Sequence, residues 1–260
     1  MADGDLPTIM LACPRYSHDM NADLAHRVYL GASDHRHVVR IYSVGGSLLC
    51  RGFNTAWAAA LTAAEKGEVD YFSMIHSDIV PEKFWCDKLV DELHASGADV
   101  LSAVVPLKGM HGYTSTAIGK PDFRWQPLTR LTMREVDKLP ETFGAEDIGY
   151  PECPLLVNTG CWIADLRKEF WREADENGFF KYFFTINDQV YRSRTGKITV
   201  ATEPEDWFFS RLLHENGKVV KATKKIALHH HGDIGLTNQG AWGSEETDTL
   251  SAAIWENADA

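Results

Sequence analysis

The chain lacks the sequence patterns of several common protein classes. Its five cysteines include no pair with C-x-x-C spacing and their number is odd, which argues against both a zinc ribbon and a disulfide framework. No apolar run approaches the length that crosses a membrane, and a strand expected to begin near Thr8 leaves no room for a signal peptide. The sequence therefore predicts reduced thiols, no membrane span and a cytoplasmic location.

Positive charge is scarce as well. The chain has 26 lysines and arginines against 37 aspartates and glutamates, a formal net charge of -11. Proteins that bind nucleic acid over a broad surface usually carry a basic footprint, so we do not expect such a surface, although a local basic groove stays open. No strand-like segment is followed by G-x-G-x-x-G, so the chain lacks the fingerprint of a dinucleotide-binding fold.

The clearest pattern that is present is a buried strand at residues 71–75. This segment is apolar except for one serine, which is typical of a strand buried on both faces. His76, Ser77 and Asp78 follow it, and Pro81 is predicted to open a helix. Because His76 and Asp78 are two residues apart, their side chains can point the same way, toward the edge where open α/β sheets bind ligands. One face of the predicted helix is apolar and consists of Trp85, Leu89, Val90 and Leu93.

Other elements are predicted on both sides of this strand. Strands are expected at residues 8–14, 37–44 and 99–105. A helix is expected between the second strand and residues 71–75, with Ser47 as its N-cap and Gly67 as its stop. Residues 107–150 show no clean period and are predicted to be rich in loops.

Two polar blocks are candidates for binding. On the predicted helix, Arg51 and Asn54 are three residues apart and share a face. Asn158, Thr159 and Gly160 precede another apolar strand, where glycine lets the backbone approach a ligand and the two polar side chains can bond hydroxyl groups. The alternatives are a solvated surface pair for the first block and a plain turn for the second.

An acidic pair opens a later helix. Thr202 and Glu205 have capping-box spacing, so Glu205 is predicted to bond back to the start of its own helix. Asp206 has no such explanation. Its place near a helix start predicts a pKa lowered by the helix dipole.

Three consecutive histidines lie in the last strand pattern, at residues 226–232. Strand alternation puts His229 and His231 on one face and His230, together with Leu228, on the other. Because the run is internal and lies within a strand, an expression tag does not explain it.

Taken in order, the blocks Arg-x-x-Asn, His-x-Asp, Asn-Thr-Gly, Glu-Asp-Trp and the His-rich strand resemble the GT-A-fold glycosyltransferases over residues 8–232. That family places an Asp-x-Asp motif at this strand end, where it holds a divalent metal against the diphosphate of a nucleotide-sugar. His76 stands where the first Asp is usual, so the match is a variant. The resemblance implies an α/β fold, a single GT-A-like, Rossmann-type mixed sheet flanked by helices over residues 1–260. Residues 1–106 would form the nucleotide-binding half, and residues 107–260 a loop-rich half that serves the acceptor and completes the metal site.

The resemblance also implies roles for particular residues. The metal ligands would be Asp78, His76, His229 and His231. The donor would be bound by Ala12, Cys13, Pro14, Arg51, Asn54, His76, Ser77, Asp78, Asn158, Thr159 and Gly160. The catalytic block would be Asp206 with Glu205; we assign the acceptor proton to Asp206, because Glu205 is predicted to be engaged in the cap.

The implied function is transfer of a sugar from a nucleotide-diphosphate sugar, a UDP-sugar in particular, to a hydroxyl-bearing acceptor such as a glycan, a small molecule or a modified nucleic acid. Mixed carboxylate and imidazole ligands favour Mn²⁺ over Mg²⁺ as the cation. Two alternatives stay open. A nucleotidyltransferase that makes nucleotide-sugars would usually show a Gly-rich basic loop after the first strand, and a non-catalytic sugar-binding module would need neither metal nor acidic helix.

Overall fold

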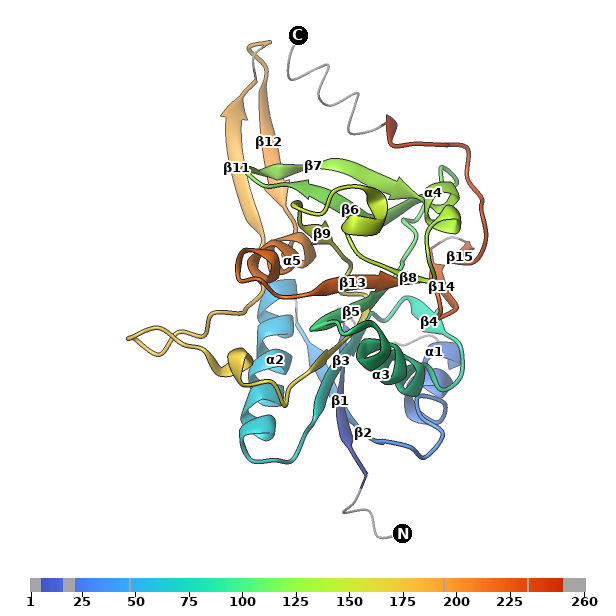
Figure 1. Ribbon diagram of the computed structural model, residues 1–260, viewed down its shortest axis with the longest axis vertical. Helices are drawn as coiled ribbons and strands as arrows, with labels where there is room; N and C mark the ends of the chain where they lie inside the picture. The colour runs from blue at the N-terminus through green and yellow to red at the C-terminus, as the bar shows by residue number, and fades with distance from the viewer. Residues whose placement is uncertain (1–5, 16–21, 47, 194, 233, 250–260) are drawn as a thin grey trace.

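The computed structural model describes residues 6–15, 22–46, 48–193, 195–232 and 234–249. A seven-stranded mixed sheet lies at its centre (Figure 1). In spatial order its strands are β2 (Val38–Gly45), β1 (Thr8–Arg15), β3 (Tyr71–Ile75), β10 (Cys161–Asp165), β5 (Val100–Ala103), β13 (Val220–Thr223) and β8 (Thr142–Phe143). The predicted α/β class and the four strands predicted up to residue 105 are confirmed.

Strand direction brings distant chain segments to one edge of this sheet. β2, β1 and β3 run parallel, and β13 runs parallel to β5. β10 lies between β3 and β5 and is antiparallel to both. The carboxyl ends of β1, β3, β5 and β13 therefore meet the amino end of β10, and we call this the strand-end edge.

Helices cover both faces of the sheet. α1 (Ala22–Tyr29) and α3 (Trp85–Ser96) share one apolar core with β1 and β3, whereas α2 (Leu49–Glu65) and α5 (Glu205–Glu215) pack into a second, more aromatic core on the other face. In that second core the Trp57 and Trp162 rings lie 6.1 Å apart. Among the described residues, no helix combines the length and the apolar character needed to cross a membrane.

The ends of α2 follow the prediction in part. Ser47, the predicted N-cap, lies outside the described residues, and Leu48 at the N-cap position makes no side-chain capping bond. Gly67 adopts φ 70° and donates its N–H to the Ala64 carbonyl oxygen at 3.0 Å. This left-handed conformation suits glycine and ends the helix as predicted.

Pro81 does not open a helix, so that prediction is wrong. It ends β4 (Ile79–Pro81), which pairs with β14 (Leu228–His231), and α3 begins only at Trp85. β4 is an edge strand of a three-stranded sheet ordered β15 (Gly235–Thr237), β14 and β4, and an edge tolerates a residue without an N–H. The apolar face of α3 is as predicted, since Trp85, Leu89, Val90 and Leu93 are all buried.

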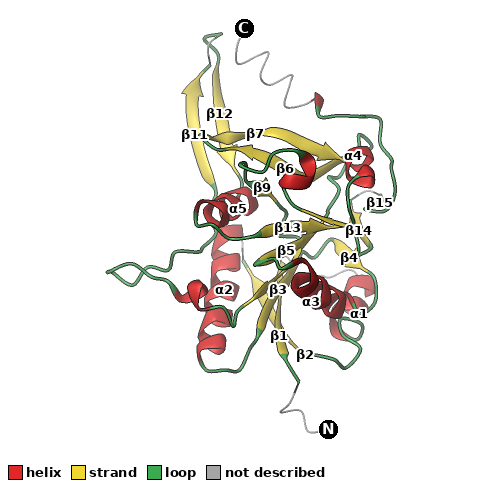
Figure 2. Cartoon of the chain, viewed as in Figure 1, coloured by secondary structure: helices red, strands yellow, loops and turns green. Residues whose placement is uncertain are grey.

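The segment 107–150 is not the loop-rich region that was predicted. It contains β6 (Tyr113–Lys120) and β7 (Phe123–Thr132), which form a second sheet with β9 (Leu155–Leu156), followed by α4 (Met133–Lys138) (Figure 2). β6 is buried although it is rich in hydroxyl side chains. Its polar groups are satisfied internally: Thr114 donates its hydroxyl to the Leu131 carbonyl oxygen at 2.8 Å. Because these hydroxyl side chains are buried, the strand does not show the apolar pattern by which buried strands are predicted.

A buried carboxylate ties α3 to the loop before β2. Asp87 accepts hydrogen bonds from the Ser33 hydroxyl at 2.7 Å, the Asp34 N–H at 2.7 Å and His37 Nδ1 at 2.6 Å. Burial alone would raise the pKa of Asp87, but these hydrogen bonds outweigh it and hold the pKa below its ordinary value. The stabilisation is therefore present above the pKa of the unfolded carboxyl group and is lost as the pH falls through the lower, folded value.

We expect Asp87→Asn to lower the free energy of unfolding by about 1.5–3 kcal/mol at pH 7, because bonds to a charged acceptor are lost. Urea unfolding measures this loss, which should shrink as the pH falls toward 3. Asp91→Asn is the matched control on the same helix, since the Asp91 side chain is 58% exposed, and it should change stability by less than about 0.5 kcal/mol. Equal effects of the two substitutions would contradict the assignment.

Candidate functional site

The strand-end edge brings two of the predicted polar blocks together. His76 follows β3, and its N–H donates to the Gly160 carbonyl oxygen at 2.8 Å. The Asn158 side chain bonds the Gly160 N–H. A Cβ atom on Gly160 would lie 2.5 Å from Ile79 Cδ1, so a larger residue here would displace the Ile79 side chain. Residues 76–78 and 158–160, far apart in sequence, therefore form one polypeptide edge.

Asp78 is the centre of charge at this edge. Its Oδ2 lies 2.5 Å from Lys108 Nζ and 3.4 Å from His230 Nε2. Burial alone would raise the pKa of Asp78, but the hydrogen bonds from His230 and Lys108 outweigh burial and hold this pKa well below its ordinary range. Asp78 is thus a carboxylate at any pH at which the protein would work.

His230 is oriented toward Asp78 by a second hydrogen bond. Its Nδ1 lies 2.7 Å from the Pro106 carbonyl oxygen, and since a carbonyl oxygen only accepts, Nδ1 carries the hydrogen. Nε2 then faces the Asp78 carboxylate, to which it donates a hydrogen bond when it carries a hydrogen. A separation of 3.4 Å between Nε2 and Oδ2 also suits a cation that takes the place of this hydrogen, because two ligands about 2.1 Å from one ion lie roughly 3–3.5 Å apart. A backbone carbonyl that fixes the ring is the usual outer partner of a metal-ligating histidine.

The other predicted ligands are placed differently. The ring centroids of His229 and His231 lie 6.3 Å apart. His231 contacts Asp78 through the backbone: its N–H donates to the Asp78 carbonyl oxygen at 2.8 Å. Burial lowers the pKa of His76 to about 4, and its buried Nε2 has no hydrogen-bond partner among the described residues. The described residues form no cluster of three His, Cys, Asp or Glu side chains arranged to hold a metal. The donor set that fits a cation is therefore Asp78 with His230, a histidine that was not among the predicted ligands.

The acidic pair opens α5, which leads into β13, a strand parallel to β5. The Ser210 hydroxyl of α5 accepts a hydrogen bond from the Val157 N–H at 3.1 Å, so α5 lies beside the segment that precedes residues 158–160. Glu205 and Asp206 are each only 8% exposed. The predicted capping box is absent: Pro204 occupies the N-cap, and the Thr202 hydroxyl donates to Asp188 at 2.6 Å. The structural explanation of Glu205 is therefore wrong.

The predicted lowering of the Asp206 pKa is also wrong. Burial and the neighbouring Glu205 carboxylate raise the pKa of Asp206, and burial raises that of Glu205 as well. The Trp207 N–H donates to Asp206 Oδ1 at 2.8 Å, and the Arg130 guanidinium, which lies 4.7 Å over the Trp207 ring, opposes the rise only in part. Burial shifts a pKa far more than the partial charge of a helix end does.

The residues predicted to bind the nucleoside of the donor fall into four groups. Ala12 and Cys13 are buried within β1, so only their backbone can face a ligand, and burial raises the pKa of the Cys13 thiol to about 11. Pro14 lines a small hollow between the ends of β1 and β2 and the start of α2. Arg51 is exposed on the first turn of α2. The Asn54 amide both donates to and accepts from the Phe184 backbone, at 2.7 and 2.8 Å, which gives it a structural role.

The sugar-facing block contains one unsatisfied polar group. Thr159 is 3% exposed, and its hydroxyl has no hydrogen-bond partner among the described residues. Ser102 donates its hydroxyl to the Asn158 carbonyl oxygen at 2.6 Å, which anchors the block to the end of β5. An unpaired buried hydroxyl beside the edge is a group that a bound ligand could satisfy.

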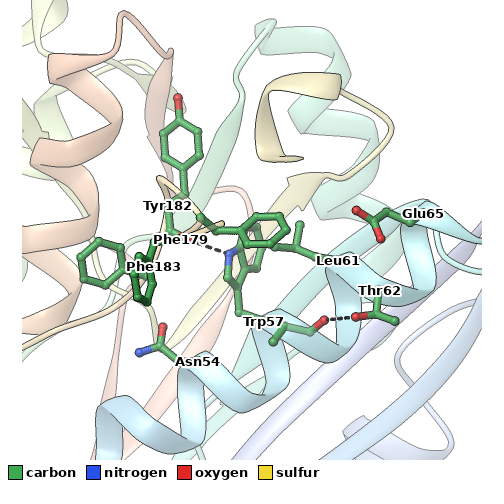
Figure 3. A pocket seen from close by; sticks show the side chains of 10 residues that line it. Asn54, Trp57, Leu61, Thr62, Glu65, Phe179, Tyr182 and Phe183 are labelled. Carbon is green, nitrogen blue, oxygen red and sulfur yellow. Dashed lines mark hydrogen bonds between the residues drawn. The ribbon is translucent and has the colours of Figure 1, made fainter. Parts of the chain in front are cut away.

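A separate apolar pocket lies between α2 and the aromatic segment 179–183 (Figure 3). It has a volume of about 460 Å³. Its lining residues come from α2 and from the aromatic segment 179–183, and they are Asn54, Trp57, Ala58, Leu61, Thr62, Glu65, Phe179, Phe180, Tyr182 and Phe183. The pocket contains none of the charged residues of the strand-end edge.

Comparison with known proteins gives little beyond this geometry. No protein-family model matches the chain, and no curated protein matches it. Among solved structures, the crystal structure of A197 from STIV is 14% identical, covers 94% of this chain and 98% of that chain, and superposes with a TM-score of 0.48. A likeness at this level establishes neither a family nor a function.

The buried acidic pair predicts an unusual dependence of stability on pH. A carboxyl group whose pKa is raised by folding stabilises the protein below its unfolded pKa, about 4, and this contribution is lost as the pH rises through the folded value. We therefore expect Asp206→Asn to become progressively more stable than the unsubstituted protein between pH 4 and pH 8, as followed by urea unfolding. Glu215→Gln, on the exposed last turn of the same helix, should show no such trend, and a flat difference for Asp206→Asn would refute the raised pKa.

Proposed function

We propose that this protein transfers a sugar from a nucleoside diphosphate sugar, a UDP-sugar in particular, to a hydroxyl group, with its sheet used in the manner of a GT-A fold. The observation that carries the proposal is the pairing of Asp78 with His230 at 3.4 Å beside the edge formed by residues 158–160. Ligands of open α/β sheets bind just beyond the carboxyl ends of the strands. A carboxylate, two imidazoles, an ammonium group and a buried hydroxyl without a hydrogen-bond partner among the described residues come together at this edge.

The diphosphate would lie against Asp78, His230 and Lys108. The Lys108 side chain is 44% exposed, and its Nζ donates to Asp78 at 2.5 Å. The ammonium group can therefore turn to a phosphate oxygen when a donor enters. Mn²⁺ or Mg²⁺ would be held by Asp78 and His230, and when bound it would stabilise the charge that develops on the leaving diphosphate. Ser77 and His76 would border the diphosphate, and the backbone of residues 12–14 with Arg51 would face the nucleoside.

The acceptor would be served by the acidic pair. Asp206, once ionised, is a stronger base than an ordinary carboxylate because its pKa is raised by burial and by Glu205. A base with a pKa closer to neutral takes the acceptor proton more readily in the transition state. Arg130, near the Trp207 ring, would hold the pair partly ionised. Asn158 and Thr159 would bond hydroxyl groups of the transferred sugar.

Ligand-induced stabilisation tests the donor and the cation together. We expect UDP with Mn²⁺ to raise the free energy of unfolding by about 2.7 kcal/mol when ligand is present at 100 times its dissociation constant, and neither alone to do as much. Asp78→Asn should abolish the joint effect, whereas Asp91→Asn should keep it. Lys108→Met should strengthen stabilisation by Mn²⁺ alone, because a competing ammonium group is removed from Asp78.

Assays with UTP, sugar 1-phosphates and free sugars separate the alternatives. Release of pyrophosphate from UTP and a sugar 1-phosphate would identify a nucleotidyltransferase. Stabilisation by free sugars without any response to nucleoside diphosphates would identify a sugar-binding module. Either outcome would overturn the transferase proposal.

Kinetics with a UDP-sugar as donor tests the acidic pair. Asp206→Asn should lower kcat about 10²–10⁴-fold, the usual contribution of a general base, with UDP binding unchanged. Glu205→Gln removes a neighbouring negative charge and so lowers the pKa of Asp206. The rise of kcat with pH should therefore move to lower pH in Glu205→Gln. A profile that does not move, or full activity in Asp206→Asn, would exclude Asp206 as the base.

A further inference from the structure

A two-stranded ribbon projects from the body of the protein (Figure 1). It consists of β11 (Asn187–Arg192) and β12 (Ile198–Glu203), which pair antiparallel with each other and with no other described strand. β12 lies on the side of the ribbon that contacts β7. β11 is therefore an edge strand. Its sequence holds no proline that would block further pairing, and an unprotected edge is a template for another strand.

The ribbon also exposes apolar side chains. Val190 and Val200 lie directly opposite each other across the two strands, and they are 73% and 57% exposed. Ile198, opposite Arg192, is 61% exposed. Three apolar side chains on one face of a projecting ribbon are costly in water unless another surface meets them.

The charges on β11 are arranged symmetrically about Val190. Asp188 and Arg192 lie two residues before and two residues after it, so alternation places all three side chains on the same face. Neither charge has an ion-pair partner among the described residues. Asp188 accepts a hydrogen bond from Thr202 at 2.6 Å, and Arg192 donates to the Gly196 carbonyl oxygen at 2.7 Å. Each side chain can therefore reach across the open edge of the strand.

We propose that a second copy of this chain pairs its β11 antiparallel with this one, about a two-fold axis at Val190. In that register Val190 meets Val190 of the second copy, and Asp188 meets Arg192 of the second copy at both ends. Directly opposite residues in antiparallel strands share a face and lie in contact. The two ribbons become one four-stranded sheet in which four valines run side by side.

The charge pattern selects this arrangement over its competitors. In-register parallel pairing would set Asp188 against Asp188 and Arg192 against Arg192, which repels at both ends. An antiparallel register shifted by two residues would leave one charge of each copy opposite an uncharged side chain. The two-fold arrangement alone pairs every charge, and a self-complementary patch is what a closed dimer requires. The proposal is independent of the sugar-transferase function.

Charge reversal tests the interface without relying on activity. In sedimentation velocity over about 1–100 µM, a range that detects dissociation constants in the micromolar range, the unsubstituted chain should show a monomer–dimer equilibrium. Asp188→Arg and Arg192→Asp should each be monomeric, because each sets like charges opposite at both ends. An equimolar mixture of the two should associate again, and so should the double variant Asp188→Arg/Arg192→Asp.

Lys197→Glu is the control, because it reverses an exposed charge on the same ribbon outside β11, and it should leave the equilibrium unchanged. Thermal unfolding of each variant checks that folding is intact. Failure of the two single variants to associate when mixed would overturn the proposed register. A chain that stays monomeric at 100 µM, or binds only an unrelated protein through the ribbon, would overturn the second copy as the occupant.

Discussion

The position of the candidate site depends on one antiparallel strand in the middle of an otherwise largely parallel sheet. β10 enters between β3 and β5 with its amino end at their carboxyl ends. The buried Ser73 hydroxyl donates to the Trp162 carbonyl oxygen at 2.8 Å, and the bond from the His76 N–H to Gly160 closes the pairing at the edge. Had β10 run parallel, Asp165 would lie at this edge and Asn158 at the opposite one. The meeting of residues 76–78 with residues 158–160 is thus a consequence of strand direction.

The small sheet of β4 and β14 extends that edge and sets its charge. His230 lies opposite Ile79 in the pairing of these strands, which holds its ring close to Asp78, one residue before Ile79. The Pro106 carbonyl oxygen then fixes which ring nitrogen faces the carboxylate. Lys108 follows in the same loop and adds a positive charge. Two separate chain segments, β14 and the loop 106–108, therefore converge on one carboxylate, and together they outweigh the cost of its partial burial.

Much of this arrangement could be predicted from local pattern, and the failures have physical causes. Buried apolar runs located β1, β3 and β5, and the pattern also located β2, although β2 is partly exposed. Alternation correctly separated His230 from its two neighbours. Alternation could not show which face of β14 lies toward Asp78, because that depends on the pairing of β14 with β4. The resemblance favoured His229 and His231 as metal ligands. β6 was missed because its buried hydroxyls bond to backbone carbonyl groups. The capping box failed because Thr202 belongs to β12, where its hydroxyl bonds a cross-strand partner.

The buried acidic pair is the feature that stability alone does not explain. Two carboxyl groups, each only 8% exposed, lie side by side, and burial raises the pKa of both. Ionising both costs free energy that two neutral amides would avoid. Their backbone positions are well supported: the Ser210 hydroxyl donates to the Asp206 carbonyl oxygen at 2.8 Å, and the Trp207 indole donates to the Ser115 carbonyl oxygen at 3.1 Å. A rigid support around a costly pair of acids is typical of a site that moves a proton. The same packing that raises the pKa of Asp206 also keeps the carboxyl group in place, so its cost in stability and its suitability as a base have one physical origin.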